Sequence, residues 1–345
     1  MTPEEPQRHM TIKDLVRLSG YSLGTVSRVL NNQPNVSEKA RTTILALAAE
    51  HGFELNTSAQ SLKQQKSNAV LVVVKGRNNE MFATMVEQLQ TLFAATTHPL
   101  IVDFIDEDDN EVQRAAQLVR ERKPCGLMLL GGSNQYFFRH FAGIPIPAVV
   151  VTHNAAALPF ANLSSVSTDD RAGADCAADY LLRCGHRNIA MLGGSLDISD
   201  TSARRYEGFL DAFRRHGLEF DAQRFYYAGR FSYENGYAGM RAILKRAPEV
   251  TAVFAMADVI AIGAMRALAD AGRRVPDDVS IIGYDGLKIS SFYTPKLTTI
   301  SQQVDLLARR SFDLLMQCMD QSAPARHITV PFTLSVRESV RNISE

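Results

Sequence analysis

The feature that most constrains the fold is an alternation, from residue 69 onward, of short apolar runs with amphipathic segments of helical period. The apolar runs, four to six residues long, are typical of strands buried on both faces and lie at 69–74, 100–104, 126–130, 148–151, 189–192, 251–255 and 279–282. The segments between them have the apolar spacing of amphipathic helices and lie at 81–95, 111–122, 173–184, 203–216, 233–246 and 259–271. This alternation predicts parallel sheets covered by helices.

The alternating region is too long for a single sheet of this kind. It spans about 280 residues, which predicts two lobes. A ligand of an open parallel sheet sits outside the carboxyl ends of the strands. The tight turns 193–195 and 283–286 follow two of the predicted strands, at those ends. We therefore expect a ligand cleft lined by such turns.

The first 55 residues have a different pattern, which predicts three short helices. Thr11 precedes the first apolar stripe and forms a capping box with Asp14, while Gly20 ends the helix. Ser22 caps the second helix and Ser37 precedes the third. The short turn between the first two helices has helix-turn-helix spacing, in which the second helix enters the DNA major groove. A generic helical hairpin has the same spacing, so spacing alone leaves both interpretations open.

The second of these helices carries side chains suited to reading DNA. Leu23, Gly24 and Arg28 are expected to face the groove, where Arg28 can bind a guanine edge through two hydrogen bonds. The hydroxyls of Thr25 and Ser27 can reach phosphates or bases. Gly24 costs about 1 kcal/mol in a helix interior and offers no side chain, so its neighbours must read the bases.

The charge distribution fits a DNA-binding head on a neutral chain. The whole sequence has 37 Lys and Arg against 37 Asp and Glu, but residues 8–66 have eight against four, a net charge of +4. That excess suits salt-dependent phosphate contacts, whereas the acidic remainder disfavours non-specific binding to DNA. With 46% hydrophobic and 21% charged residues, the composition excludes a disordered chain.

The cysteines and the apolar runs predict the compartment. Four cysteines without C-x-x-C or metal-ligand spacing predict reduced thiols and no bound metal or cofactor: Cys125, Cys176, Cys184 and Cys318. The run 69–74 is far shorter than the roughly 20 residues that a membrane span needs. Residues 1–10 are polar and lack the apolar core of a signal peptide. We therefore expect a cytoplasmic protein with no membrane partner.

Residues 11–33 (TIKDLVRLSGYSLGTVSRVLNNQ), with 36–39 (VSEK) and Gly52-Phe53, resemble the DNA-binding headpiece of the LacI/GalR family of bacterial transcription regulators. Residues 185–190 (GHRNIA) begin a series that resembles the core of the same family and continues at 193–194, 205–209, 258–263, 275–285, 295–300 and 336–339. The matches occur in order and cover nearly the whole chain.

The resemblance implies a three-part organisation in the α/β class. It implies a helix-turn-helix headpiece at 1–55, a hinge helix or linker at 56–68, and an effector-binding and dimerisation core at 69–345. The core is expected to be two-lobed and similar to periplasmic binding proteins, with parallel sheets flanked by helices. The first lobe is placed at about 69–166 plus 298–327, and the second at about 167–297 plus 328–345.

The hinge is implied to fold on operator DNA and to insert a leucine into the minor groove, and Leu62 matches that leucine. Such a wedge unstacks a base step and bends the duplex. Beyond the groove-facing residues above, the implied DNA-binding set includes Thr11, Ser22, Asn31, Asn56, Ala59 and Leu62. A polar linker with an incidental leucine is the alternative. Leu55 and Gln60 depart from the family pattern, so the operator sequence stays open.

The resemblance also implies an effector pocket in the core, formed by Phe82, His153, Thr201, Arg205, Phe231 and Asp285. The aromatic rings can lie against a pyranose, Arg205 can donate paired hydrogen bonds and Asp285 can accept them. This lining favours a sugar or sugar phosphate over a lipid. The alternative for Arg205 and Asp285 is a structural charge. Ala257 and Thr152 stand where the family commonly has asparagine and aspartate, so no relative's effector can be transferred.

No catalytic motif is present among the patterns searched, which include G-x-S-x-G, H-E-x-x-H and the Walker A sequence. The acidic run 106–109 is interpreted as a solvated loop. We expect a regulator and not an enzyme. A free-standing carbohydrate-binding protein and a sugar-processing enzyme with an accessory headpiece are the alternatives from other classes.

The predicted mechanism is that of a homodimeric repressor with one headpiece on each operator half-site. An effector in the cleft is expected to change the orientation of the lobes and thereby the packing of the hinge. Regulation by a corepressor or a partner protein is the alternative within this class. No heptad tail follows 336–339, so a coiled-coil tetramer is not expected.

Overall fold

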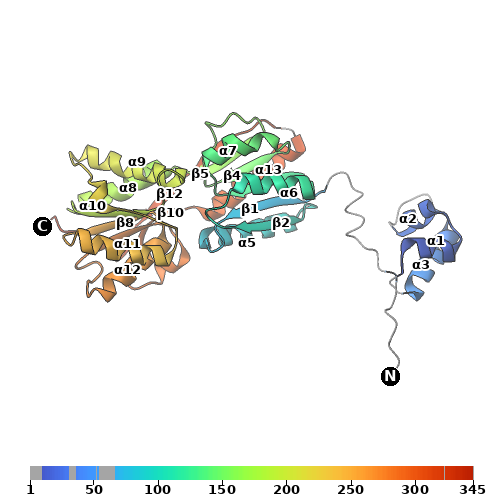
Figure 1. The fold of residues 1–345 in the computed structure, drawn as a ribbon, viewed down its shortest axis with the longest axis horizontal. Coiled ribbons are helices and arrows are strands. Elements are labelled where there is room, and N and C mark those ends of the chain that lie inside the picture. The colour runs from blue at the N-terminus through green and yellow to red at the C-terminus, as the bar shows by residue number, and fades with distance from the viewer. Residues whose placement is uncertain (1–9, 31–35, 52, 54–66, 322, 345) are drawn as a thin grey trace, which may run out of the picture. The chain divides into compact units, whose positions relative to one another are not determined.

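The computed structural model describes residues 10–30, 36–51, 53, 67–321 and 323–344. The chain divides into two compact units, Met1–Gln65 and Lys66–Glu345, which are described separately (Figure 1). The division falls inside the expected linker 56–68, of which the structure describes only residues 67 and 68.

The first unit contains the three expected helices, α1 (Ile12–Ser19), α2 (Leu23–Leu30) and α3 (Glu38–Glu50). Asp14 accepts a hydrogen bond from the Thr11 backbone N–H at 3.0 Å, so the predicted start of α1 is confirmed. Gly20 ends α1 with φ of 70°, a left-handed conformation that favours glycine. The predicted apolar faces meet in one small core: Leu15, Val26, Val29, Ala40, Ile44 and Ala48.

The first lobe of the second unit is built on a parallel sheet with the strand order β11-β5-β4-β3-β1-β2. Its strands are β1 (Val70–Lys75), β2 (Leu100–Ile105), β3 (Gly126–Leu130), β4 (Ala148–Val151), β5 (Leu163–Thr168) and β11 (His327–Val330). Its helices are α5 (Glu80–Ala94), α6 (Glu111–Arg122), α7 (Asn134–His140), the single turn η1 (Phe141–Gly143) and α13 (Val304–Gln321). Side chains of β1 alternate between two cores, one with α5 and α13 and the other with α6 and α7.

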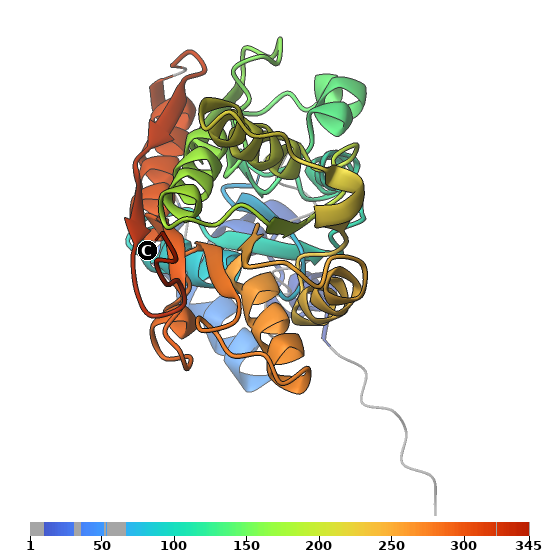
Figure 2. The ribbon, with the colours of Figure 1, turned by 90° about the vertical axis from the view of Figure 1, so that its left-hand side faces the viewer.

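The second lobe repeats this architecture with the strand order β12-β10-β9-β8-β6-β7. Its strands are β6 (Ile189–Gly193), β7 (Tyr226–Ala228), β8 (Ala252–Ala255), β9 (Ser280–Asp285), β10 (Thr298–Gln302) and β12 (Phe332–Ser335). Its helices are α8 (Asp170–Arg183), α9 (Asp200–Arg215), α10 (Ala222–Phe225), α11 (Tyr233–Arg246), α12 (Asp258–Asp270) and the short η2 (Lys288–Ser291). Figures 1 and 2 show α8 and α9 on one face of this sheet and α11 and α12 on the other.

The chain passes between the lobes after β5, after β10 and after β11. Strand β10 pairs with β9, so Thr298–Gln302 belongs to the second lobe. The sequence prediction had placed this segment in the first lobe. Strand β11 pairs with β5 and lies in the first lobe through Val330, beyond the predicted boundary at 328. Backbone hydrogen bonding between strands sets these crossing points. The sequence of a short polar strand does not show which sheet the strand joins.

The predicted α/β architecture is confirmed, since each predicted strand and helix of the core overlaps an observed one. The prediction missed β5, β7, β10, β11 and β12 and the helices α7, α10 and α13. Among the described residues, no helix has both the length and the apolar character that a membrane crossing requires.

Candidate functional site

The exposed edge of α2 is the candidate DNA-reading surface of the first unit. Val26 and Val29 are buried in the small core, whereas Leu23 is 49% exposed and Gly24 and Arg28 are exposed as well. The Arg28 Nε donates to the Gly24 carbonyl at 3.1 Å, which holds the guanidinium along the helix surface. The exposed surface of α2 therefore carries one apolar and one cationic side chain.

The other predicted DNA-binding residues occupy several environments. Thr11 donates its hydroxyl to Asp14 at 2.6 Å, and Ser22 accepts from the Thr25 N–H at 3.3 Å, so both hydroxyls are engaged at helix starts. Thr25 and Ser27 are half-buried. Four further predicted residues lie outside the described part of the chain: Asn31, Asn56, Ala59 and Leu62.

The second unit contains a buried ionic cluster at the carboxyl ends of the second-lobe strands. Arg205 on α9 is only 4% exposed and donates from Nε to Asp170 Oδ1 at 2.8 Å. Its Nη2 lies 3.8 Å from Asp285 Oδ1, and its guanidinium carbon lies 3.5 Å from the centre of the Tyr284 ring. The structure therefore brings together Arg205 and Asp285, as predicted, and adds Asp170 as the closest anionic partner.

A glycine makes room for this cluster. A Cβ at Gly173 on α8 would lie 2.4 Å from the Tyr284 hydroxyl oxygen, a distance that no real contact permits. Asp285 itself has φ of 106°. Non-glycine residues rarely adopt this backbone conformation, and where they do they cluster at functional sites.

Burial sets the protonation of the cluster. It raises the pKa of Asp285 to about 6, although Arg205 and a hydrogen bond from Gln302 Nε2 at 2.8 Å favour the charged form. Burial also raises the pKa of Asp170, and Arg205 opposes that shift. The carboxylates of the cluster consequently gain protons more readily than exposed ones do.

The remaining predicted effector residues are spread over both lobes. Phe82 on α5 is buried, with its ring against Gly131, and Phe231 is half-buried beside Gly194. His153 is buried and is stacked on Phe137 with 5.9 Å between the ring centres. Burial lowers the pKa of His153 to about 4, so its ring is neutral at neutral pH.

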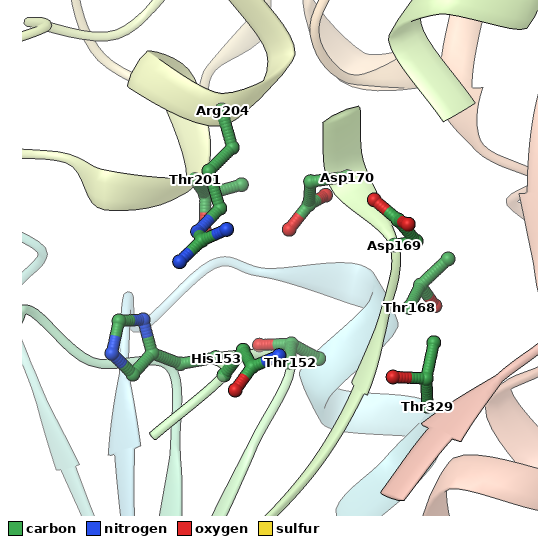
Figure 3. A pocket seen from close by; sticks show the side chains of 9 residues that line it. Thr152, His153, Thr168, Asp169, Asp170, Thr201, Arg204 and Thr329 are labelled. Atoms are coloured by element: carbon green, nitrogen blue, oxygen red, sulfur yellow. The ribbon is translucent and has the colours of Figure 1, made fainter. Parts of the chain in front are cut away.

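A polar pocket of about 110 Å³ opens where the two lobes meet (Figure 3). It includes His153 and Thr201 from the predicted set. The other lining residues, which the prediction did not include, are Thr152, Asn154, Thr168, Asp169, Asp170, Arg204 and Thr329. Arg205 and Asp285 lie in the buried cluster and are not part of the pocket wall, whereas Asp170 belongs to both.

Two sequence signals point to the missed pocket residues. Asp169 and Asp170 stand at the start of an amphipathic segment, where a carboxylate caps a helix, and Asp169 does accept from the Ala172 N–H of α8 at 3.0 Å. Arg204 precedes Arg205, and adjacent residues of a helix point in different directions. Only the tertiary structure shows that one arginine enters the cluster and the other enters the pocket.

Polar contacts join the two lobes across the cleft. Arg230 of the second lobe pairs with Asp106, with Glu107 at 2.8 Å and with Asp108 at 3.4 Å. We call these four residues the clasp. The acidic run was interpreted as a solvated loop, and it does form a partly exposed turn before α6. The interpretation did not include the pairing of three of its carboxylates with the other lobe.

Further polar contacts also join the lobes. The Tyr233 hydroxyl of α11 donates to Glu80 of α5, and Asp200 of α9 accepts from the backbone N–H of Asn134 at 2.6 Å. Polar groups of both lobes therefore contribute to holding the lobes together.

Substitution of Arg230 by glutamine is expected to loosen the cleft without unfolding the core. Its side chain is 51% exposed, and exposed ion pairs contribute little to global stability. Loss of the clasp should speed amide hydrogen exchange in segments 104–110 and 229–234, measured by mass spectrometry. The control is Arg266→Gln, whose ion pair with Asp270 lies within α12. Equal exchange in both variants would contradict a role for the clasp in lobe closure.

Models of two families match the chain. Residues 11–56 match the model described as bacterial regulatory proteins, lacI family, and residues 178–340 match a periplasmic binding protein-like domain. The first match covers the helix-turn-helix unit, and the second covers most of the second lobe together with α13 and β11 of the first lobe. The two parts of the chain thus correspond to the two parts that the resemblance implied.

Comparison with whole proteins gives the same result. The HTH-type transcriptional regulator MalR of Clostridium butyricum is 30% identical over 337 residues, which are 97% of this chain and 100% of MalR. A structure of the lac repressor dimer bound to operator is 26% identical and has a TM-score of 0.76, over 97% of this chain and 100% of that one.

A complex of the regulator CelR with cellobiose is 27% identical and has a TM-score of 0.71, over 96% of this chain and 100% of that one. The helix-turn-helix unit, the two-lobed core and these full-length similarities agree. The chain belongs to the lacI family of bacterial regulatory proteins, which are DNA-binding transcription regulators and not enzymes.

Proposed function

We propose that the protein is a repressor whose operator affinity is set by a sugar or sugar derivative in the cleft of the core. The observation that carries this proposal is the ionic cluster of Arg205, Asp170 and Asp285, placed at strand ends beside a polar pocket between the lobes. Arginine donates and carboxylates accept hydrogen bonds, which is the combination that hydroxyl-rich ligands require. The cellobiose bound to the similar regulator CelR supports the same class of ligand.

The cluster also provides a route from ligand to lobe movement. Gln302, at the end of β10, donates to Asp285 of the second lobe and accepts from the Thr168 hydroxyl of β5 at 2.8 Å. A ligand that competes for Asp285 would therefore act on a residue that joins the lobes. In this way binding would favour one lobe orientation over the other.

Operator binding in the presence of sugars tests this proposal. The full-length chain is titrated onto labelled operator DNA with and without each candidate sugar. An inducer weakens operator binding, whereas a corepressor strengthens it, so the direction of the change also decides the sign of regulation. A repressor of this kind is excluded if the chain binds no specific DNA sequence, or if no sugar changes its affinity.

For DNA reading, we propose that α2 lies in the major groove and that residues 56–68 form the hinge, with Leu62 as the minor-groove wedge. Replacement of Arg28 by alanine should weaken specific operator binding about ten- to a hundredfold, because it removes a bidentate contact to a base edge. Binding to random DNA, which rests on phosphate contacts, should change much less. Equal losses on both DNAs, measured by fluorescence anisotropy, would make Arg28 a phosphate contact instead.

We also propose that the chain acts as a homodimer through the second lobe. Phe292, which follows η2, is 74% exposed, and Ile289 is exposed beside it. Val336 is 55% exposed and lies nearby, since Arg337 Nη1 donates to Ser290 Oγ at 3.0 Å. A cluster of exposed apolar side chains of this kind marks a protein interface.

Replacement of Phe292 by aspartate should shift the chain from dimer to monomer, with at least a tenfold rise in the dimer dissociation constant. Sedimentation velocity over a concentration series measures the change. The control is Phe138→Asp, since Phe138 is 58% exposed but lies on α7 of the first lobe. A dimer unaffected by the first substitution would place the interface elsewhere.

A further inference from the structure

Arg204 gives the pocket a cationic wall. The side chain leaves α9 one residue before Arg205, and Figure 3 shows its guanidinium extending into the pocket on the side of Thr152 and His153. Arg204 is exposed, unlike Arg205, and so it can meet a ligand without prior rearrangement.

The carboxylates around the pocket are already engaged by other groups. Asp170 binds Arg205, and Asp169 accepts from the Ala172 N–H at the start of α8. Asp200, four residues before Arg204, accepts from the backbone N–H of Asn134 at 2.6 Å and from its side-chain amide at 3.3 Å. In the part of the chain that the structure describes, no carboxylate forms an ion pair with Arg204.

The rest of the wall consists of uncharged hydrogen-bonding groups. Four threonines contribute hydroxyls, namely Thr152, Thr168, Thr201 and Thr329. His153 contributes a neutral ring, whose Nε2 lies 3.0 Å from Asn134 Oδ1. The pocket therefore combines one cation that forms no ion pair among the described residues with two carboxylates and several hydroxyls.

We propose that the effector is a sugar bearing an anionic group, a carboxylate or a phosphate, which pairs with Arg204 while the sugar hydroxyls bind the threonines and Asp169. This inference rests on the proposed sugar effector and specifies its charge. An arginine guanidinium pairs with either anion through two parallel hydrogen bonds, a geometry that a neutral sugar cannot use as well.

Thermal unfolding of the full-length chain with a defined set of sugars tests the inference. The set contains glucose and galactose as neutral sugars, glucuronate, galacturonate and gluconate as sugar acids, and glucose 6-phosphate. Acetate and inorganic phosphate report binding of an anion without a sugar. The expected result is a rise in the unfolding midpoint with at least one sugar anion, larger than with its neutral parent and smaller at high salt. Comparison of the sugar acids with glucose 6-phosphate decides which anion is preferred.

Three variants assign the effect to Arg204. In Arg204→Gln, the dissociation constant for the sugar anion should rise about ten- to a hundredfold, whereas Arg204→Lys should retain part of the affinity. The matched control is Arg273→Gln, an exposed arginine after α12 with no ion pair among the described residues, which should bind as the natural chain does.

Four results would overturn the inference. If a neutral sugar stabilises the chain as much as its anionic derivative, or if Arg204→Gln binds the sugar anion unchanged, the charge assignment fails and the sugar effector stands. If acetate or phosphate alone binds as tightly as the sugar anion, Arg204 is a general anion site. If no sugar of either kind changes the midpoint or operator binding, the proposed effector class fails together with the inference.

Discussion

Replacement of Arg205 by alanine is expected to lower the free energy of unfolding of the core by about 3–5 kcal/mol. The side chain is 4% exposed, and its removal leaves the Asp170 carboxylate buried without its partner at 2.8 Å. The surface charge of the chain changes little, so the loss of stability comes from breaking the buried ion pair of Arg205 and Asp170. Urea unfolding followed by circular dichroism measures it, and ligand-induced stabilisation should disappear in the same variant.

The pH dependence of this variant provides an internal check. Without Arg205, the pKa values of Asp170 and Asp285, already raised by burial, should rise further. A carboxyl group whose pKa is raised on folding binds its proton more tightly in the folded state, so stability falls as the pH rises through that range. The variant should therefore lose more stability at pH 8 than at pH 5.

A double variant separates the charge from the packing. Asp170→Asn combined with Arg205→Gln removes both charges, so it should be more stable than Arg205→Ala alone although it cannot bind the effector. If the double variant is as unstable as the single one, the arginine stabilises the core by packing rather than by pairing with Asp170.

Replacement of Gly208 by alanine is the second substitution with a large expected effect. A Cβ at Gly208 on α9 would lie 2.0 Å from the backbone carbonyl oxygen of Arg171 on α8. A backbone atom within a helix cannot turn aside, so the two helices must separate, at a cost of about 1–3 kcal/mol or more. The same separation would move Arg205 away from Asp170, so effector affinity should fall as well.

Gly143 provides the matched control. A Cβ at this position would meet nothing within 4 Å, and its φ lies outside the left-handed region. Gly143→Ala should therefore stay within about 0.5 kcal/mol of the natural chain. If Gly208→Ala is no less stable than Gly143→Ala, the close packing of α8 on α9 does not hold the cluster in place.

The strands that the sequence predicted, apart from the half-exposed edge strand β2, share one property, which is burial among apolar neighbours on both faces. In β1, all residues from Val70 to Val74 are buried, and β3, β4 and β8 are buried throughout. A central parallel strand needs this composition because helices cover both faces of its sheet. The sequence therefore revealed the middle of each sheet and the α/β class.

Three of the missed strands, β5, β10 and β11, are rich in polar residues and lie where the chain crosses between the lobes. Strand β5 is fully buried although four of its six residues are serine or threonine, and Ser165 Oγ lies 2.9 Å from His327 Nδ1 of β11. In β10, the Thr299 hydroxyl donates to Asp258 Oδ1 at 2.6 Å. These partners are distant in sequence, so no local pattern marks such a segment as a strand.

The sequence alone determined the family, the helix-turn-helix unit and several cleft residues, because caps, apolar periods and short motifs are local properties. Tertiary structure decided which charges meet. Arg205 pairs with Asp170, and Arg230 of the second lobe binds the acidic run that the sequence presented as a solvated loop. The tertiary structure also places Arg204 at the pocket, without an ion pair among the described residues. An ion pair requires two groups within a few ångströms, and here that proximity comes from helix packing and from the lobe crossings.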